Sequence, residues 1–162
     1  MQSRFLPRYD VVCQSDGLTY TFQTDNGSTY KLEFVHFDVF AGVPTDSVFA
    51  FNIDRIVRSR QPDDSIRIRN SVAYVISIFF RQVDNAIITS CEVDDGMQRG
   101  RKRLFDRWFN QMNDGNILTL SAQQQTGLGL TDATLYYHRE NIFRHVLERE
   151  FREYIDLMNQ LN

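Results

Sequence analysis

One short stretch of the chain is rich in cations that could bind an anion. It reads VDDGMQRGRKRLFDRWFNQM and contains Arg99, Arg101, Lys102, Arg103 and Arg107. Arg99, Arg103 and Arg107 are four residues apart, so in a helix they would form a stripe on one face. Like charges at this spacing weaken an isolated helix by about a few tenths of a kcal/mol per pair. The stripe is therefore either a solvated face with local ion pairs or a surface for phosphate, nucleic acid or an acidic protein.

A second group of arginines precedes this stretch and could join it in space. Between Arg55 and Arg107 the chain has 11 Arg and Lys against 7 Asp and Glu, whereas the remainder has 7 against 14. Binding to a merged positive patch would weaken steeply with salt. Besides the stretch above, the predicted ligand-binding residues are Arg58, Arg60, Arg67 and Arg69.

Catalytic patterns are weaker than this basic pattern. The histidines His36, His138 and His145 belong to no HExxH, HxH or Cys/His motif, so the sequence predicts no metal site. We expect His36 and His138 to end strands. If the protein is an enzyme, His36, Tyr137 and His138 are the candidate acids or bases.

The composition predicts one domain over residues 1–162, with residues 1–9 as a loose N-terminal arm. No apolar run approaches the roughly 18 residues that a membrane span needs, and the start has no signal-peptide core. Cys13 and Cys91 are too few to staple the fold. We therefore expect a cytoplasmic protein with free thiols; its oligomeric state stays open.

Strands are expected in the first third of the chain. GLTYTFQTD and STYKLEFVHF both alternate apolar and polar residues, and the DNG of Asp25–Gly27 between them favours a tight hairpin. Ser47–Ile56 should form a third strand. The polar loop that follows leads into a buried helix over Ile68–Val83, for which Asp63 and Asp64 are candidate N-caps.

The rest of the chain alternates between strands and helices. We expect a strand at Ala86–Val93 and a helix at Met97–Met112, then a hairpin of ILTLSAQ and ATLYYHR, and a final helix capped by Asn141. The predicted order is β-β-β-α-β-α-β-β-α. This order predicts an α+β fold with a mixed, mainly antiparallel sheet and three helices.

The segment Ser65–Asn113 resembles the second half of a GNAT-type acetyltransferase, where a helix, a strand and a helix with an aromatic end follow one another. RLFDRWF at Arg103–Phe109 stands in the place of that aromatic end. ITSCEVDDGMQRGRKRLFDRWF also resembles the signature "DG…RxRLFxxWF" of a small uncharacterised bacterial domain family, over about residues 18–160. That second resemblance implies no activity.

The first resemblance implies a GNAT-like fold and an acyl-CoA donor. However, acetyltransferases bind the pyrophosphate of coenzyme A on a glycine-containing loop, and this chain has RQPDDSIRIRN there. Without glycine the backbone N–H groups approach a phosphate less closely, and Asp63 and Asp64 would repel it.

We therefore favour a non-catalytic binding module without a cofactor, which uses its arginines for an anionic partner. The alternative is an atypical acyltransferase whose arginines hold a phosphorylated acyl-CoA donor. A role as an accessory part of a defence or toxin–antitoxin pair also stays open.

Overall fold

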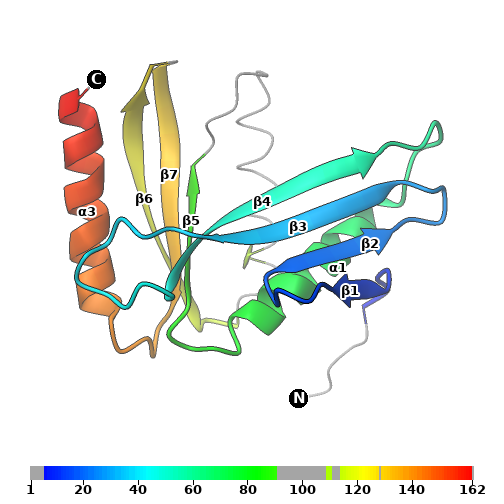
Figure 1. The fold of residues 1–162 in the computed structure, drawn as a ribbon, viewed down its shortest axis with the longest axis horizontal. Coiled ribbons are helices and arrows are strands. Elements are labelled where there is room, and N and C mark those ends of the chain that lie inside the picture. The colour runs from blue at the N-terminus through cyan, green and yellow to red at the C-terminus, as the bar shows by residue number, and fades with distance from the viewer. Residues whose placement is uncertain (1–5, 91–108, 111–113, 128, 162) are drawn as a thin grey trace.

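The computed structural model describes residues 6–90, 109–110, 114–127 and 129–161 (Figure 1). These residues form an α+β fold in which seven strands make one mixed sheet, in the order β1-β2-β3-β4-β5-β7-β6. Neither helix of the described residues is long and apolar enough to cross a membrane. The elements are β1 (Val11–Cys13), β2 (Thr19–Gln23), β3 (Thr29–His36), β4 (Val48–Val57), α1 (Ser65–Phe79), β5 (Ala86–Ser90), β6 (Ile117–Thr126), β7 (Gly129–His138) and α3 (Arg144–Leu161).

The predicted fold class is wrong in its elements. It gave six strands and three helices, whereas the described residues form seven strands and two helices. The additional strand is β1, which is too short to show a period and gains its strand conformation by pairing with β2. Of the second predicted helix, Met97–Met112, only Phe109 and Asn110 are described, and the Phe109 ring stacks on Tyr136 with ring centres 3.8 Å apart.

The parallel pair β4 and β5 divides the sheet. Every other pair of neighbouring strands in the described sheet is antiparallel, and α1 makes the crossover that a parallel pair requires. The register of β4 with β5 covers three residue pairs and ends at Ala50 and Ile88, although β4 continues to Val57. Beyond that point the two strands diverge (Figure 1). We call this point the fork.

The sheet carries a core on each face, because successive side chains of a strand point to opposite sides. One core lies under α1 and the other under α3, which packs beside β6 and β7 (Figure 1). The α1 core contains Phe22, Leu32, Phe34, Phe49, Phe51, Val72, Val75, Ile76 and Phe79. The α3 core contains Val48, Ala86, Ile88, Leu135, Tyr137, Leu147, Phe151 and Ile155.

The predicted first hairpin is confirmed as β2 and β3. Tyr20 and Phe22 are buried on one face, as the alternation indicates. In the turn, Gly27 has a φ of 90°, a conformation that glycine adopts without strain. The Gly27 N–H donates to the Thr24 carbonyl at 3.0 Å, which closes the turn.

The described end of the predicted N-terminal arm packs against the domain. Tyr9 is 3% exposed, and its N–H donates to the Ser71 hydroxyl at 2.9 Å. Its ring stacks on Phe22, and the Arg8 guanidinium lies 3.7 Å from the centre of the Tyr74 ring. This segment therefore joins β2 to α1.

The second hairpin is longer than its apolar pattern predicts. β6 and β7 pair over ten residues each, up to Thr126 opposite Gly129. β6 is the last strand of the sheet, so one of its edges faces away from β7. The Asn159 side chain accepts the Gln125 N–H at 2.7 Å and donates to the Gln123 carbonyl at 3.3 Å. A helix side chain thus occupies part of an edge that could otherwise pair with another chain.

Candidate anion-binding surface and fork cavity

The predicted basic surface is only partly within the described residues. Arg58, Arg60, Arg67 and Arg69 are described. The cations of the predicted basic helix lie outside the described residues: Arg99, Arg101, Lys102, Arg103 and Arg107. The surface therefore has to be built from the four arginines between β4 and the first turns of α1.

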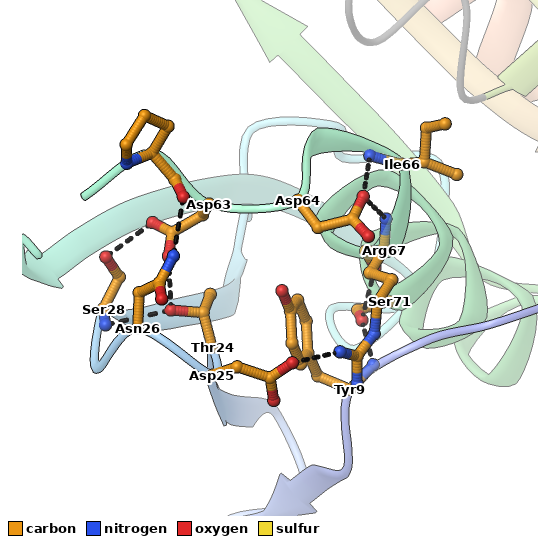
Figure 2. A network of polar contacts seen from close by, with 11 residues as sticks. Tyr9, Thr24, Asp25, Asn26, Ser28, Asp63, Asp64, Ile66, Arg67 and Ser71 are labelled. Atoms are coloured by element: carbon orange, nitrogen blue, oxygen red, sulfur yellow. Dashed lines mark hydrogen bonds and ion pairs between the residues drawn. The ribbon is translucent and has the colours of Figure 1, made fainter.

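Arg67 is engaged within the protein. Its guanidinium forms an ion pair with Asp25 in the β2–β3 turn and lies 4.0 Å from the centre of the Tyr9 ring (Figure 2). A cation over an aromatic ring is attracted by the ring face. Arg67 thus fastens the hairpin and the N-terminal segment to α1, so it is the least available of the four to a partner.

A polar clasp holds the loop between β4 and α1 against the same turn. The Asp63 carboxylate accepts hydrogen bonds from the hydroxyls of Thr24 and Ser28, both at 2.6 Å (Figure 2). The Ser28 hydroxyl also accepts the Ser59 N–H at 2.9 Å. We call Thr24, Ser28, Ser59 and Asp63 the Asp63 clasp. Its hydrogen bonds hold the two ends of the loop, at Ser59 and Asp63, against the β2–β3 turn.

The ionised form of Asp63 is favoured in this clasp. Burial raises the pKa of Asp63, but the hydrogen bonds from Ser28 and Thr24 and the charge of Arg55 lower it by more. The pKa of Asp63 therefore lies below its usual value. Of the two predicted caps, only Asp64 caps α1, and Asp63 acts in the clasp instead.

Arg58 and Arg60 lie on either side of Ser59, whose N–H belongs to the clasp. Both side chains are exposed, and neither forms an ion pair with a carboxylate of the described residues. Arg69 is half-buried on α1, and its Nε has no hydrogen-bond partner there. Arg67 thus contacts the β2–β3 turn, and Arg58 and Arg60 flank Ser59, which is hydrogen-bonded to the same turn. Of these three arginines, Arg58 and Arg60 form no ion pair with a described residue.

The N-terminus of α1 is closed to an external anion. The Asp64 carboxylate accepts the N–H groups of Ile66 and Arg67, at 3.0 and 3.2 Å. These are the donors that a bound phosphate would use at a helix start. An anion at this end of the molecule has to rely on side chains instead.

The three candidate catalytic residues do not meet. His36 stands opposite Phe49, with ring centres 4.9 Å apart, and so lies on the face that α1 covers. Tyr137 belongs to the α3 core, on the opposite face and three strand spacings away, about 14 Å. His138 accepts the Glu140 N–H at the end of β7. Within the described ranges no three His, Cys, Asp or Glu side chains form a metal-type group.

The proton of Tyr137 is held firmly. Burial and the hydrogen bond that its hydroxyl donates to Glu148, at 2.7 Å, raise the pKa of Tyr137 to about 12. A hydroxyl with so high a pKa stays protonated at neutral pH, and its O–H already donates to Glu148. Tyr137 is therefore poorly suited to act as a general base.

A cavity of about 90 Å³ opens at the fork, and the sequence interpretation missed it. A signal was present, because strand alternation places Gln124 in line with Leu118, Leu120 and Ala122, on a face that should be apolar. Gln124 is 3% exposed. The cavity is lined by Phe37, Ala50, Phe51, Asn52, Ile88, Thr89, Gln124 and Tyr154.

The fold and these sites define an α+β domain on one mixed sheet that is forked between its two parallel strands. The chain belongs to a family of unknown function, DUF6169, whose family model matches residues 63–153. No curated protein and no solved structure matches the chain. The resemblance to acetyltransferases and the "DG…RxRLFxxWF" signature therefore gain no support from the comparisons.

Proposed function

We propose that this chain is a binding module for an anionic partner and that Arg58 and Arg60 form part of the contact surface. The proposal is carried by their arrangement on either side of a clasped residue. Because the Ser59 N–H is hydrogen-bonded to Ser28, the backbone that carries the Arg58 and Arg60 side chains is held in place. A preorganised backbone reduces the ordering entropy that binding must overcome.

Binding without catalysis is favoured by the separation of the candidate acids and bases. His36 and Tyr137 lie on opposite faces of the sheet, and a general base must come within hydrogen-bond reach of the proton it removes.

The number of available cations bears on the kind of partner. Proteins that bind duplex DNA with steep salt dependence make about 6–10 phosphate contacts. Arg58 and Arg60 alone suit a single phosphate group or a short acidic segment of a protein. A nucleic acid would also need the predicted helix face with Arg99 and Arg103. Phosphate, acidic peptide and nucleic acid are therefore separate arms of the test.

Replacing Arg58 and Arg60 together with alanine is expected to weaken binding about tenfold. Each exposed charged contact contributes roughly 0.2–1 kcal/mol, and about 1.4 kcal/mol corresponds to tenfold in affinity. The probes are inorganic pyrophosphate, a glutamate-rich peptide and a single-stranded oligonucleotide, titrated by calorimetry at low and high salt.

The matched control is Arg149→Ala with Arg152→Ala, which removes the same charge from exposed positions on α3. It should change the affinity less than twofold. The proposal fails if none of the probes binds, or if the control weakens binding as much as the Arg58 and Arg60 pair does. The variant Arg99→Ala with Arg103→Ala tests the predicted helix face in the same assay.

A second candidate function, acyl transfer, is favoured by one observation, the fork. A separated parallel pair leaves strand edges that an extended, amide-containing ligand can pair with, and the pantetheine arm of an acyl-CoA has that chemistry. The carboxylates of Asp63 and Asp64 oppose it, because they occupy the loop where the acetyltransferase resemblance would place a pyrophosphate.

If acyl-CoA binds, acetyl-CoA at about a hundred times its Kd should stabilise the fold by about 2.7 kcal/mol. For a chain of this size that corresponds to a rise in Tm of roughly 5–10 °C. Thermal unfolding with and without millimolar acetyl-CoA measures it. An unchanged Tm would remove acetyl-CoA as a ligand and leave the anion-binding proposal standing.

A further inference from the structure

The outer part of β4 presents an unpaired strand edge. β4 pairs with β5 only as far as Ala50, whereas it stays paired with β3 up to Val57. Among the described residues no other strand takes the place of β5 beside this part of β4. An unpaired edge offers backbone N–H and C=O groups to an extended chain.

Alternation identifies the residues whose backbone groups face this edge. The Phe34 N–H donates to the Leu18 carbonyl, so the backbone groups of Phe34 face β2 and not β4. In an antiparallel pair the residue opposite such a position, here Phe51, directs its own N–H and C=O away from β3. Ile53 and Arg55 follow at intervals of two residues along the same register, so their backbone groups also point away from β3.

The two faces of the sheet differ in chemistry along this edge. Ile53 packs against the α1 core, so Arg55, two residues later, lies on the same face. Asn52 lies on the opposite face and lines the fork cavity together with Phe37 and Tyr154, which pack against the α3 core. The cavity measures about 90 Å³, and none of its lining residues carries a charge. It therefore suits a small uncharged side chain, whereas the face of Arg55 suits an acidic one.

The charges along this edge favour an acidic partner over a second copy of the chain. Arg55, Arg58 and Arg60 are all exposed, whereas Asp54 is the one carboxylate in the sequence from Phe51 to Arg60. Two copies paired through this edge would bring two sets of arginines together, and like charges destabilise strand pairing. An acidic segment places its carboxylates beside the arginines instead.

We infer that an extended segment of an acidic partner protein, in which small uncharged residues alternate with acidic ones, adds to the outer part of β4 as a further strand. The inference rests on the proposed function and specifies its partner. The backbone of the segment pairs with Ile53 and Arg55, and one of its uncharged side chains enters the fork cavity. Its carboxylates lie on the other face, beside Arg55 and Arg58. In this mode of recognition main-chain hydrogen bonds supply affinity and alternate side chains supply specificity.

The first test uses two isomeric peptides that differ only in the edge that is blocked. The parent is an alternating valine and glutamate peptide of about ten residues, a length that spans this edge. One isomer carries N-methyl groups on its central valines, and the other carries them on its central glutamates. Successive N–H groups of a strand point to opposite edges, so only one isomer loses the donors that face β4. In anisotropy titrations at low salt we expect that isomer to bind about tenfold more weakly than the parent, and the other to bind within about twofold of it.

The outcomes separate this inference from the proposed function. Equal affinities of the two isomers overturn the inference, and the proposed function still stands if the Arg58 and Arg60 variant weakens both. Absence of binding by the parent peptide also overturns the inference, whereas binding of inorganic pyrophosphate would leave the proposed function standing.

The second test removes a donor from the protein. Ile53→Pro deletes an N–H that faces away from β3, so the ladder between β3 and β4 keeps its hydrogen bonds. We expect it to bind the parent peptide about tenfold more weakly than Ile53→Ala, which loses the same packing but keeps the N–H. Equal binding by the two variants contradicts the inference.

Hydrogen exchange on the wild type gives a readout that does not depend on a variant. The N–H groups of Ile53 and Arg55 should exchange at least about tenfold more slowly with the parent peptide bound, whereas that of Asp54, which faces β3, should change little. Unchanged exchange at Ile53 and Arg55 with the peptide bound overturns the inference. Should Ile53→Pro fail to fold, this measurement and the two isomers still decide.

Discussion

Replacing Phe34 with alanine is expected to lower the free energy of unfolding by about 3–5 kcal/mol. Phe34 is 2% exposed, and its ring stacks on Phe79 of α1 with centres 4.1 Å apart. The same ring contacts Phe51 at 4.9 Å and Tyr20 at 6.1 Å. The substitution removes the side chain that links three strands to α1, and rigid aromatic neighbours can only partly close the resulting cavity.

Denaturant unfolding followed by circular dichroism measures this loss. Val35→Ala is the matched control, since Val35 is the next residue of β3, points to the other face and is 44% exposed. It should cost less than about 0.5 kcal/mol. A loss below about 1.5 kcal/mol for Phe34→Ala would mean that α1 does not pack on β3 and β4 as described.

The sequence predicts the elements whose burial is periodic. The β2–β3 hairpin, α1 and α3 follow a two-residue or 3.6-residue pattern, because each buries one face against the core. β4 reads as a strand from its apolar residues, and its first residues are buried on both faces. The boundaries of α1 were less accurate: the apolar stripe predicts Ile68–Val83, and the helix is Ser65–Phe79. Its start is set by the Asp64 cap rather than by apolar residues.

Elements that depend on pairing partners were not predicted. β1 has an exposed Val12 and Cys13, so nothing in its own residues separates it from a loop. The outer halves of β6 and β7 are polar, with QQQT and GLTD, and the ten-residue ladder holds them in strand conformation. The spacing of apolar residues within a segment carries no information about the hydrogen bonds that its backbone forms with another strand.

For the candidate sites too, the sequence shows the types of the residues but not the contacts that they make in the fold. The sequence shows that Arg58, Arg60 and Arg67 are cationic, but it does not show their partners. In the structure Asp25 forms an ion pair with Arg67, and Asp63 accepts hydrogen bonds from Thr24 and Ser28 instead of pairing with Arg58 or Arg60. The fork cavity combines residues from β4, β5, β6 and α3, so only the unexpected polarity of Gln124 could have indicated it. Tyr154 reads as an ordinary apolar-face residue of the final helix.

Among the polar contacts of the described residues, we expect the Asp63 clasp to contribute most to the free energy of unfolding. Asp63→Ala is expected to lower the free energy of unfolding by about 2–4 kcal/mol. It removes two hydrogen bonds to a charged group, which contribute about 1.5–3 kcal/mol each, and water replaces part of that loss because Asp63 is only half-buried. Thr24 and Ser28 are 4% and 0% exposed, so their hydroxyls would be left without this acceptor. Asp54→Asn, an exposed change on β4, is the control and should cost less than about 0.5 kcal/mol.

The dependence of this loss on pH separates charge from shape. The pKa of Asp63 is lower in the folded chain than the value of about 3.9 expected when unfolded, so the folded state binds the proton more weakly. The resulting stabilisation is complete above the unfolded pKa and is lost as the pH falls through the folded pKa. The difference in unfolding free energy between the wild type and Asp63→Asn should therefore stay constant from neutral pH to about pH 5 and shrink below it. A difference that persists undiminished in acid would mean that the clasp depends on the shape of the side chain and not on its charge.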